Sequence, residues 1–403
     1  MSFFDNRYYY VNKRLLSVIG QWPFQSRLES NMMFAVTSLF IFSLTAFEFW
    51  GLAAGITDLN IIMENASPLL VNCMMIIKFI NCVITNDKMK VLYEDIEQTW
   101  KKKCTGAEKE ILQRYAEKSR SFTIRYAKEF IAVALYATWL FYSTTPLVIT
   151  WIYKLLPTNE TYTARFLYRM EHVLDMDKYF NLLMLHGFIS VFYIVQVPIA
   201  LESTFVFCTH HICALLECIR YNIECLQSTD FVLLEPNIKD DKTYHDLVDC
   251  IKSYKHVLKL SDVLASNYAV SFLFLLGNII ICLSFGAAEI IIIDIQLDEL
   301  IRILAADLAQ VAHIYVLSMI SQRLIDHSSA FQDVIYSCDW YNMSIRSRRL
   351  VMFTIMRTTK PCEIKAGKIF VMSMENFSSI LKVSLSYFTM LTSLQESEKT
   401  ISF

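Results

Sequence analysis

The last hydrophobic run of the chain, 369–394, closes with Ser384-Leu385-Ser386-Tyr387-Phe388-Thr389-Met390-Leu391-Thr392-Ser393-Leu394. The run is long enough to cross a bilayer as a helix. It nevertheless contains Glu375 and Lys382, and its final turns mix Ser and Thr with large apolar side chains. Polar groups are costly in hydrocarbon, so a helix that faces only lipid rarely carries them. The pattern is typical of a helix that lines a water-filled path.

The composition of the whole chain indicates a membrane protein. Of its 403 residues, 55% are hydrophobic and only 19% are charged. The apolar residues lie in long blocks, which favours solvation by lipid over a large soluble core. A formal net charge of −2 gives no reason to expect nucleic-acid binding.

Seven runs are long and apolar enough to span a bilayer as helices. Their ranges are 32–57, 66–85, 130–153, 179–219, 263–293, 303–322 and 369–394. The predicted fold class is therefore all-α, a polytopic membrane protein with seven transmembrane helices. The fourth run could extend about 60 Å as a helix and should project beyond the membrane.

The basic residues predict the orientation of these spans. If the N-terminus is cytoplasmic and the C-terminus extracellular, 29 of the 37 Lys and Arg residues lie on the cytoplasmic side, as the positive-inside rule requires. The sequons at Asn65 and Asn159 then fall in the first and second outside loops, where glycosylation is possible. We expect modification at Asn159 rather than Asn65, because Pro68 and the bilayer are close to Asn65.

Amphipathic segments lie on the cytoplasmic side of three spans. Leu247, Ile251, Tyr254 and Leu258 recur at helical spacing and should extend span five. Phe331, Val334, Ile335 and Cys338 should likewise extend span six, and 350–356 forms a short apolar piece. Such faces either lie on the membrane surface or pack against one another. We favour mutual packing into a cytoplasmic bundle.

Several classes of protein are disfavoured by the sequence. The eleven cysteines show neither a disulfide framework nor zinc-ligand spacing, and we expect no metal and no cofactor. No catalytic motif is present, so we expect no enzyme. A G-protein-coupled receptor would need an extracellular N-terminus, against the charge distribution. A secondary transporter would show internal repeats and helices broken by Gly or Pro.

The topology and the closing motif together resemble the insect odorant receptor family. The motif is Ser386 to Leu394, preceded by Phe377-Ser378-Ser379-Ile380-Leu381-Lys382. The chain looks like a ligand-specific tuning receptor rather than the co-receptor Orco. A long second cytoplasmic loop is expected of Orco, whereas here only residues 220–262 separate spans four and five. The alternative is a seven-helix G-protein-coupled or gustatory-type chemoreceptor. The Thr-Tyr and Gln-Phe ending of gustatory receptors is absent.

The resemblance implies a ligand-gated, non-selective cation channel that assembles with Orco as a heterotetramer around one pore. It also implies a split seventh helix, with a cytoplasmic anchor part and a part that crosses the membrane. Alignment with the family's motif places a hydrophobic gate at Met390 and a polar position at Ser393. Ser386 shares this helix face, and a ring containing Met can close a pore by dewetting. Without the resemblance, Met390 reads as a filler between helices.

The resemblance further implies an apolar pocket for a small hydrophobic odorant or pheromone, in the outer halves of spans two, three, four and six. The candidate ligand-binding residues are Met74, Met75, Tyr136, Trp139, Leu140, Ser143, Met184, Phe188, Phe192, Leu304, Leu308 and Val311. Lipid or core packing is the competing interpretation for each one.

Several polar residues within spans keep two interpretations. His186 and His313 could donate to an oxygenated ligand, although a hydrogen bond between helices is the stronger expectation. Asp307 and Glu289 either attract cations near the outer mouth or make structural bonds. Lys382 could pair with Glu375 or with a residue of another helix.

We expect this organisation in the plasma membrane of an olfactory neuron dendrite, in contact with membrane lipid. The expected parts are a cytoplasmic N-terminus at 1–31, transmembrane helices one to four and the ligand-binding part at 32–219, a cytoplasmic loop with an amphipathic helix at 220–262, helices five and six at 263–322, a cytoplasmic anchor region at 323–368, the pore-lining helix at 369–394 and an extracellular tail at 395–403.

Overall fold

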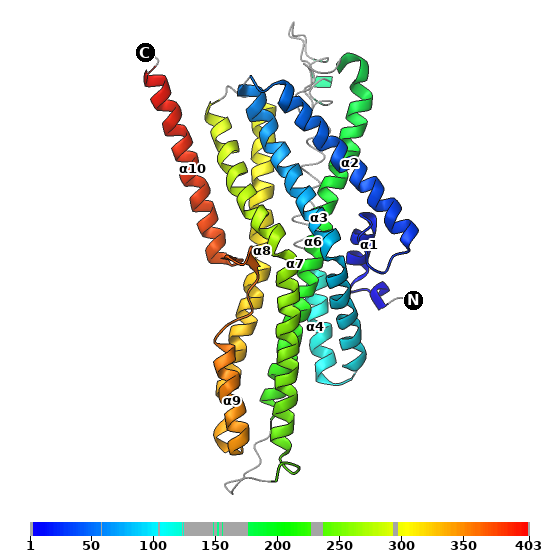
Figure 1. The fold of residues 1–403 in the computed structure, drawn as a ribbon, viewed down its shortest axis with the longest axis vertical. Coiled ribbons are helices and arrows are strands. Elements are labelled where there is room, and N and C mark those ends of the chain that lie inside the picture. The colour runs from blue at the N-terminus through cyan, green and yellow to red at the C-terminus, as the bar shows by residue number, and fades with distance from the viewer. Residues whose placement is uncertain are drawn as a thin grey trace.

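The chain folds into long helices that run roughly side by side, as Figure 1 shows. A computed structural model of the chain describes residues 3–122 except 58 and 104, residues 176–226, 237–292 and 297–401, and isolated positions between 123 and 175. The helices are α1 Tyr10–Val18, α2 Arg27–Ala54, α3 Leu59–Lys102, α4 Ala107–Phe122, α6 Met176–Glu224, α7 Lys242–Ile292, α8 Leu297–Ser337, α9 Ile345–Thr358 and α10 Met374–Ile401. Two short 3-10 helices lie at Phe3–Asp5 and Trp340–Asn342.

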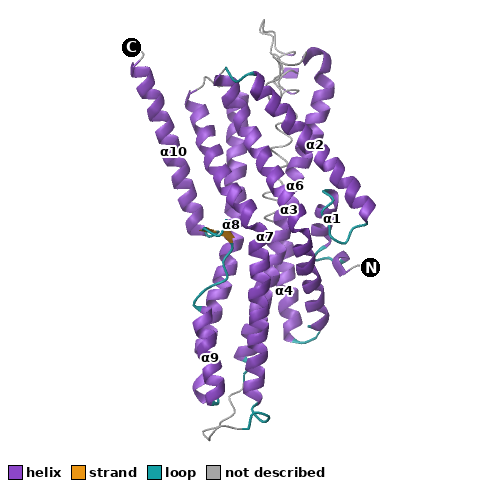
Figure 2. Cartoon of the chain, viewed as in Figure 1, coloured by secondary structure: helices purple, strands orange, loops and turns teal. Residues whose placement is uncertain are grey.

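Strands make only a small contribution to the described part of the chain. A two-stranded antiparallel hairpin, β1 Lys365–Ala366 and β2 Phe370–Val371, connects α9 to α10 (Figure 2). All other regular structure in the described residues is helical. The predicted all-α class is confirmed apart from this hairpin.

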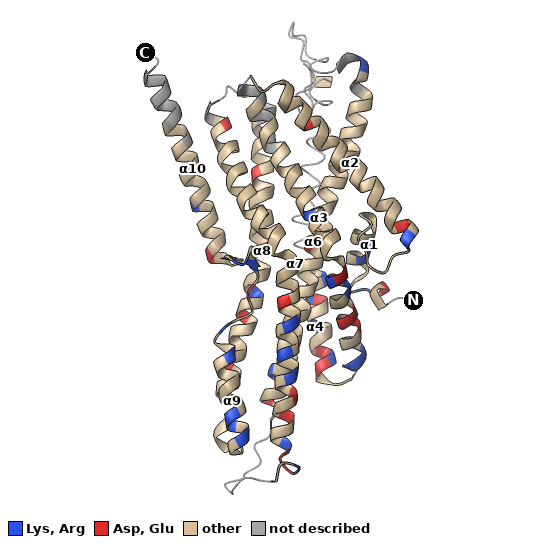
Figure 3. Cartoon of the chain, in the orientation of Figure 1, with Lys and Arg blue, Asp and Glu red and all other residues tan. Residues whose placement is uncertain are grey.

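Five described helices contain stretches long and apolar enough to cross a membrane: α2, α3, α6, α7 and α8. They correspond to predicted spans one, two, four, five and six; among the described helices, α10, which contains most of predicted span seven, does not meet this criterion. Predicted span three, 130–153, lies almost entirely outside the described residues. Charged residues gather in the lower half of the molecule, whereas the upper half, which contains the C-terminal end, is nearly free of them (Figure 3). One end of the bundle is therefore suited to lipid and the other to water.

The helix α6 lies at the centre of the bundle. It contacts α1, α2, α3, α4, α7 and α8. Its middle section is almost completely buried, from Val195 to Leu216. The prediction that the fourth run forms one continuous helix longer than a bilayer is confirmed, because α6 spans 49 residues.

The amphipathic faces that were predicted to be cytoplasmic pack against one another. Leu247 and Tyr254 of α7, Phe331 of α8 and Val351 of α9 are all buried. The rings of Tyr254 and Phe331 stack with centroids 4.7 Å apart. The preferred interpretation, mutual packing, is confirmed for these residues. The extension of α3 to Lys102 and the separate helix α4 were not predicted.

The predicted boundaries of the last helix, 369–394, are wrong at both ends. Residues 369–373 belong to the hairpin and a short connection, because Gly367 and Lys368 adopt positive φ angles and turn the chain back. The side chain of Ser373 then accepts a hydrogen bond from the backbone N–H of Asn376, which caps the start of α10. At the other end the helix continues to Ile401, so residues 395–401 are not an irregular tail.

Candidate functional site

The helix α10 lies along one flank of the molecule (Figure 1). It packs on α7 and α8. The hydroxyl of Ser284 in α7 donates to the backbone carbonyl of Ser384, at 3.3 Å, and the rings of Tyr315 in α8 and Phe377 meet edge to face at 5.6 Å. Ser384 is buried by this contact, so it marks the inward side of α10.

The predicted pore residues lie on the opposite side of α10 from this contact. The side chain of Met390 is 56% exposed, and Ser386 and Ser393 are exposed as well. Each serine hydroxyl donates to a backbone carbonyl one turn earlier, that of Lys382 for Ser386 and that of Thr389 for Ser393. The hydroxyl oxygens remain able to accept hydrogen bonds from water. The described part of the chain leaves this face uncovered.

Lys382 is exposed on α10. Among the described residues no ion pair joins it to Glu375 or to any other carboxylate. The sequence left its partner open, and this chain alone provides none in the described segments.

The predicted ligand residues of α3, α6 and α8 differ in their surroundings. Met74 and Met75 are buried in the core, while Met184, Phe192 and Val311 are half-buried. Three others are exposed, with Leu308 at 69% and Leu304 and Phe188 less so. The methionines of α3 thus face the bundle, whereas Leu304 and Leu308 face outward. Tyr136, Trp139, Leu140, Ser143 and the sequon Asn159 lie outside the described residues.

The sequon at Asn65 is unsuited to glycosylation. Asn65 lies inside α3 and is 1% exposed, so a glycosyltransferase could not reach its side chain in the folded chain.

Polar side chains in the upper half of the molecule form hydrogen bonds between helices. This was the stronger expectation for His186 and His313. The Nε2 atom of His186 in α6 lies 2.8 Å from the hydroxyl of Ser43 in α2, between the rings of Phe40 and Phe47. The amide of Asn72 donates to both carboxylate oxygens of the buried Glu48, at 2.6 Å each. These bonds tie α2 to α6 and to α3.

Asp307 of α8 lies against α7, and Glu289 belongs to the last turn of α7. A Cβ atom placed on Gly286 of α7 would be only 2.7 Å from a carboxylate oxygen of Asp307. Glu289 is buried. The positions fit a structural role in helix contact better than an open ring of charge.

Three deeply buried ionisable side chains form a cluster that joins three helices. The ammonium of Lys78 in α3 donates to Glu202 in α6 at 2.8 Å and lies 3.0 Å from Nε2 of His313 in α8. His313 also contacts the same carboxylate oxygen of Glu202. All three side chains are almost fully buried. Removing one member of such a cluster leaves an uncompensated charge, at a cost of ~3–5 kcal/mol.

This Lys78–Glu202–His313 cluster lies next to the predicted ligand residues along the helices. Lys78 follows Met74 by one helical turn, and His313 is two residues beyond Val311. The sequence showed an ionisable residue within each of three apolar runs, which is the signal that could have suggested the cluster. The rotation of each helix about its axis, which brings the three together, was not predictable from it.

Comparisons with known proteins agree with this architecture. A family model described as 7tm Odorant receptor matches residues 58–385. The odorant receptor coreceptor of Drosophila melanogaster is 28% identical over 148 residues, which are 36% of this chain and 30% of the coreceptor. Odorant receptor 2a of the same organism is 24% identical over 153 residues, 38% of each chain. The matched stretches therefore span well under half the length of these relatives.

The fold is similar to that of a solved insect olfactory receptor. The structure of olfactory receptor OR5 from Machilis hrabei in complex with eugenol superposes with a TM-score of 0.78, covering 96% of this chain and 97% of that one at 13% identity. A second structure of the same receptor superposes with a TM-score of 0.76. The likeness at this identity concerns the fold. Because the family model matches most of its length, the chain, a multi-pass membrane protein, belongs to the insect odorant receptor family.

Proposed function

We propose that this chain is the ligand-specific subunit of an odorant-gated, non-selective cation channel that works together with the co-receptor Orco. The observation that carries the proposal is the uncovered face of α10. Ser386, Met390 and Ser393 share this face and point away from the side that packs on α7. This helix face is narrow and largely polar, and no other described part of the chain covers it. Such a face is suited to lining a pore shared between subunits.

The gate is proposed at Met390. A ring of four large apolar side chains excludes water from a narrow pore, and a small rotation that replaces them with serine hydroxyls lets water return. The split between α9 and α10 supports the proposal, because the hairpin allows α9 to stay in the cytoplasmic bundle while α10 moves.

The ligand is proposed to be a small hydrophobic odorant or pheromone held among α3, α6, α8 and predicted span three. The buried methionines of α3 and the aromatic residues of α6 provide an apolar, adaptable surface of the kind that such ligands require. The related receptor solved with eugenol supports a compact, lightly polar molecule as the ligand class.

The membrane orientation is proposed from charge. With the basic lower half in the cytoplasm, the C-terminal end of α10 lies outside, and predicted span three completes seven crossings (Figure 3). The expected location is the plasma membrane of an olfactory neuron dendrite.

Patch-clamp recording from cells that express the chain with Orco tests the proposal. An odorant panel should evoke cation current within milliseconds, and the current should persist when G-proteins are blocked. Met390→Ala should raise the ligand-independent current or alter permeability. A current that requires GTP would contradict the channel mechanism.

A further inference from the structure

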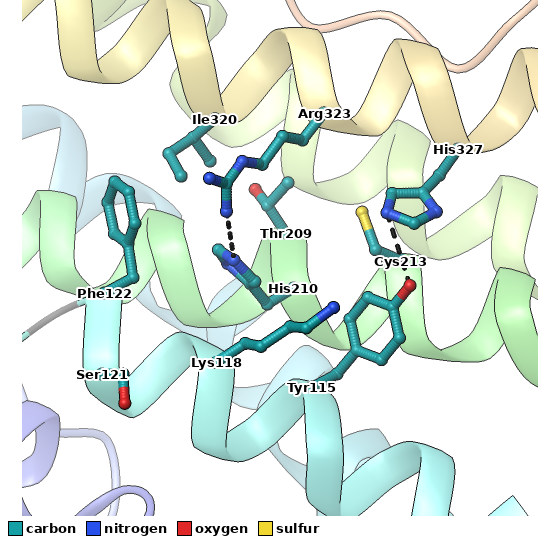
Figure 4. Close-up of a pocket in the computed structure, with 10 residues that line it drawn as sticks. All are labelled: Tyr115, Lys118, Ser121, Phe122, Thr209, His210, Cys213, Ile320, Arg323 and His327. Carbon is teal, nitrogen blue, oxygen red and sulfur yellow. Dashed lines mark hydrogen bonds between the residues drawn. The ribbon is translucent and has the colours of Figure 1, made fainter.

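A second site is formed by α4, α6 and α8 in the charged half of the molecule, away from the proposed odorant pocket. It is a cavity of about 430 Å³ (Figure 4). Its inner wall is provided by buried residues, among them Phe122, Cys213 and Ile320. The proposed odorant pocket and pore use none of them.

Two basic side chains extend into this cavity from opposite walls. Lys118 comes from α4 and Arg323 from α8, and both are exposed at its rim. In the described segments neither forms an ion pair with a carboxylate. Their near contacts are aromatic rings, 5.0 Å from the Lys118 Nζ to the Tyr115 centroid and 5.3 Å from the Arg323 Cζ to the Phe122 centroid. The two positive charges converge on a space whose described lining residues include no carboxylate.

A buried histidine holds Arg323 in place. A guanidinium N–H donates to Nε2 of His210 at 3.3 Å, and Nδ1 of the same ring lies 2.8 Å from the carbonyl oxygen of Val206. A guanidinium only donates and a carbonyl only accepts, so the Nδ1 atom carries the proton and Nε2 accepts. His210 is thus a neutral support that orients the guanidinium at the cavity.

The nearby acids are already engaged elsewhere. Glu217 pairs with Arg114 at 3.4 Å and with Arg220 at 3.9 Å, and Asp326 accepts a hydrogen bond from Gln322 at 2.8 Å. Further donor capacity comes from the Tyr115 hydroxyl, which lies 3.4 Å from Nε2 of His327. Asp326 keeps its charge, since Gln322 is neutral, but it is not one of the described lining residues; these combine two cations with hydroxyl and imidazole groups.

We propose that this cavity binds a phosphate-bearing group. Arg and Lys together with a hydroxyl suit the charge and the several acceptor oxygens of a phosphate. With the membrane orientation proposed above, on which this step rests, the end of α4 at Phe122 and the predicted start of span three at Phe130 put the cavity at the level of the cytoplasmic lipid headgroups. Two sources supply this chemistry: the headgroup of an inositol phospholipid in the inner leaflet, and a soluble inositol phosphate.

Binding to the purified, full-length chain in detergent tests the proposal without any measurement of current. The probes are dioctanoyl phosphatidylinositol 4,5-bisphosphate and inositol 1,4,5-trisphosphate, titrated by microscale thermophoresis. The double variant Lys118→Gln/Arg323→Gln should bind the better probe at least about tenfold more weakly. Lys118→Gln alone changes an exposed rim residue and should weaken binding several-fold.

The matched control is Arg120→Gln/Lys252→Gln, which removes the same charge outside the cavity, and it should bind like the unmodified chain. Tighter binding of the lipid than of the trisphosphate identifies the membrane headgroup as the source, and tighter binding of the trisphosphate identifies the soluble phosphate. Either result, with loss in the double variant, supports the site. Equal affinity of the unmodified chain and both double variants, or no binding of either probe, overturns it.

Discussion

The helices α6 and α10 differ strongly in how much of their surface the rest of the described chain covers. α6 is surrounded by six helices, and its middle section is buried on every side. α10 contacts chiefly α7 and α8, and leaves Leu385, Tyr387 and Met390 more than half exposed. The sequence of α6 is explained by contacts within this chain. Under the proposed function, that of α10 is explained by surroundings outside the described chain, namely lipid, partner subunits and a pore.

The largest effect is expected from a substitution in the buried cluster that α6 forms with α3 and α8. Glu202→Ala removes the carboxylate that neutralises Lys78 and should destabilise the folded chain by ~3–5 kcal/mol. Thermal unfolding in detergent, followed by fluorescence-detected size exclusion, measures the loss. The signal of monodisperse receptor should fall sharply.

The matched control for Glu202 is Glu97→Ala. Glu97 pairs with Lys101 at 2.8 Å on the surface of α3, and the side chain of Lys101 is 69% exposed. Losing such a pair should cost less than about 1 kcal/mol. If Glu202→Ala and Glu97→Ala unfold at the same temperature, the cluster does not hold α3, α6 and α8 together.

A smaller effect is expected at the β1–β2 hairpin, which connects the packed helix α9 to the exposed helix α10. Gly367 has φ +59°, its N–H donates to the carbonyl of Ala269 at 2.8 Å, and an added Cβ would lie 2.6 Å from Leu273. Gly367→Ala should destabilise by ~1–3 kcal/mol, because a side chain is strained in this conformation and crowds α7. The unfolding temperature measures it.

Gly277→Ala is the control for that change, since no atom lies within 4 Å of its added Cβ. In the middle of α7 it should leave stability unchanged or raise it by up to about 1 kcal/mol. Equal destabilisation by both substitutions would remove the strained turn as the cause.

The smallest predicted change separates ligand contact from packing. Trp139→Ala should shift the odorant dose–response curve by about tenfold, the loss of roughly 1.4 kcal/mol of apolar contact, without abolishing surface expression. Leu39→Ala, on the exposed side of α2, serves as the comparison and should leave the curve in place. Unchanged curves for every ligand with Trp139→Ala would remove that residue from the pocket.

The long apolar runs and their cytoplasmic extensions were predictable because they depend on local pattern. The periodicity of Leu247, Tyr254 and Leu258 predicted the lower part of α7, and Phe331 predicted that of α8. α4 escaped notice although Ile111, Tyr115 and Phe122 form its buried face at helical spacing. Its many charged residues obscured that apolar face, and no helix was predicted there.

The contacts between helices were harder to predict from the sequence. Lys78, Glu202 and His313 were visible as ionisable residues in apolar runs, but nothing local fixes how each helix is rotated. The start of α10 depended on the positive φ of Gly367 and Lys368 and on the cap at Ser373, which interrupt an otherwise apolar run. The exposure of Met390 agrees with the face that the spacing of Ser386 and Ser393 defined.

The central claim is that the uncovered face of α10 lines a pore, and cysteine accessibility tests it most directly. Met390→Cys and Leu385→Cys are each expressed with Orco, and odorant-evoked current is recorded before and after a charged, membrane-impermeant thiol reagent. Both side chains are more than half exposed, yet their positions are on different faces of the helix. The account predicts that the reagent reduces the current through Met390→Cys and leaves that through Leu385→Cys unchanged. Unchanged current through Met390→Cys, or equal loss in both, would contradict it.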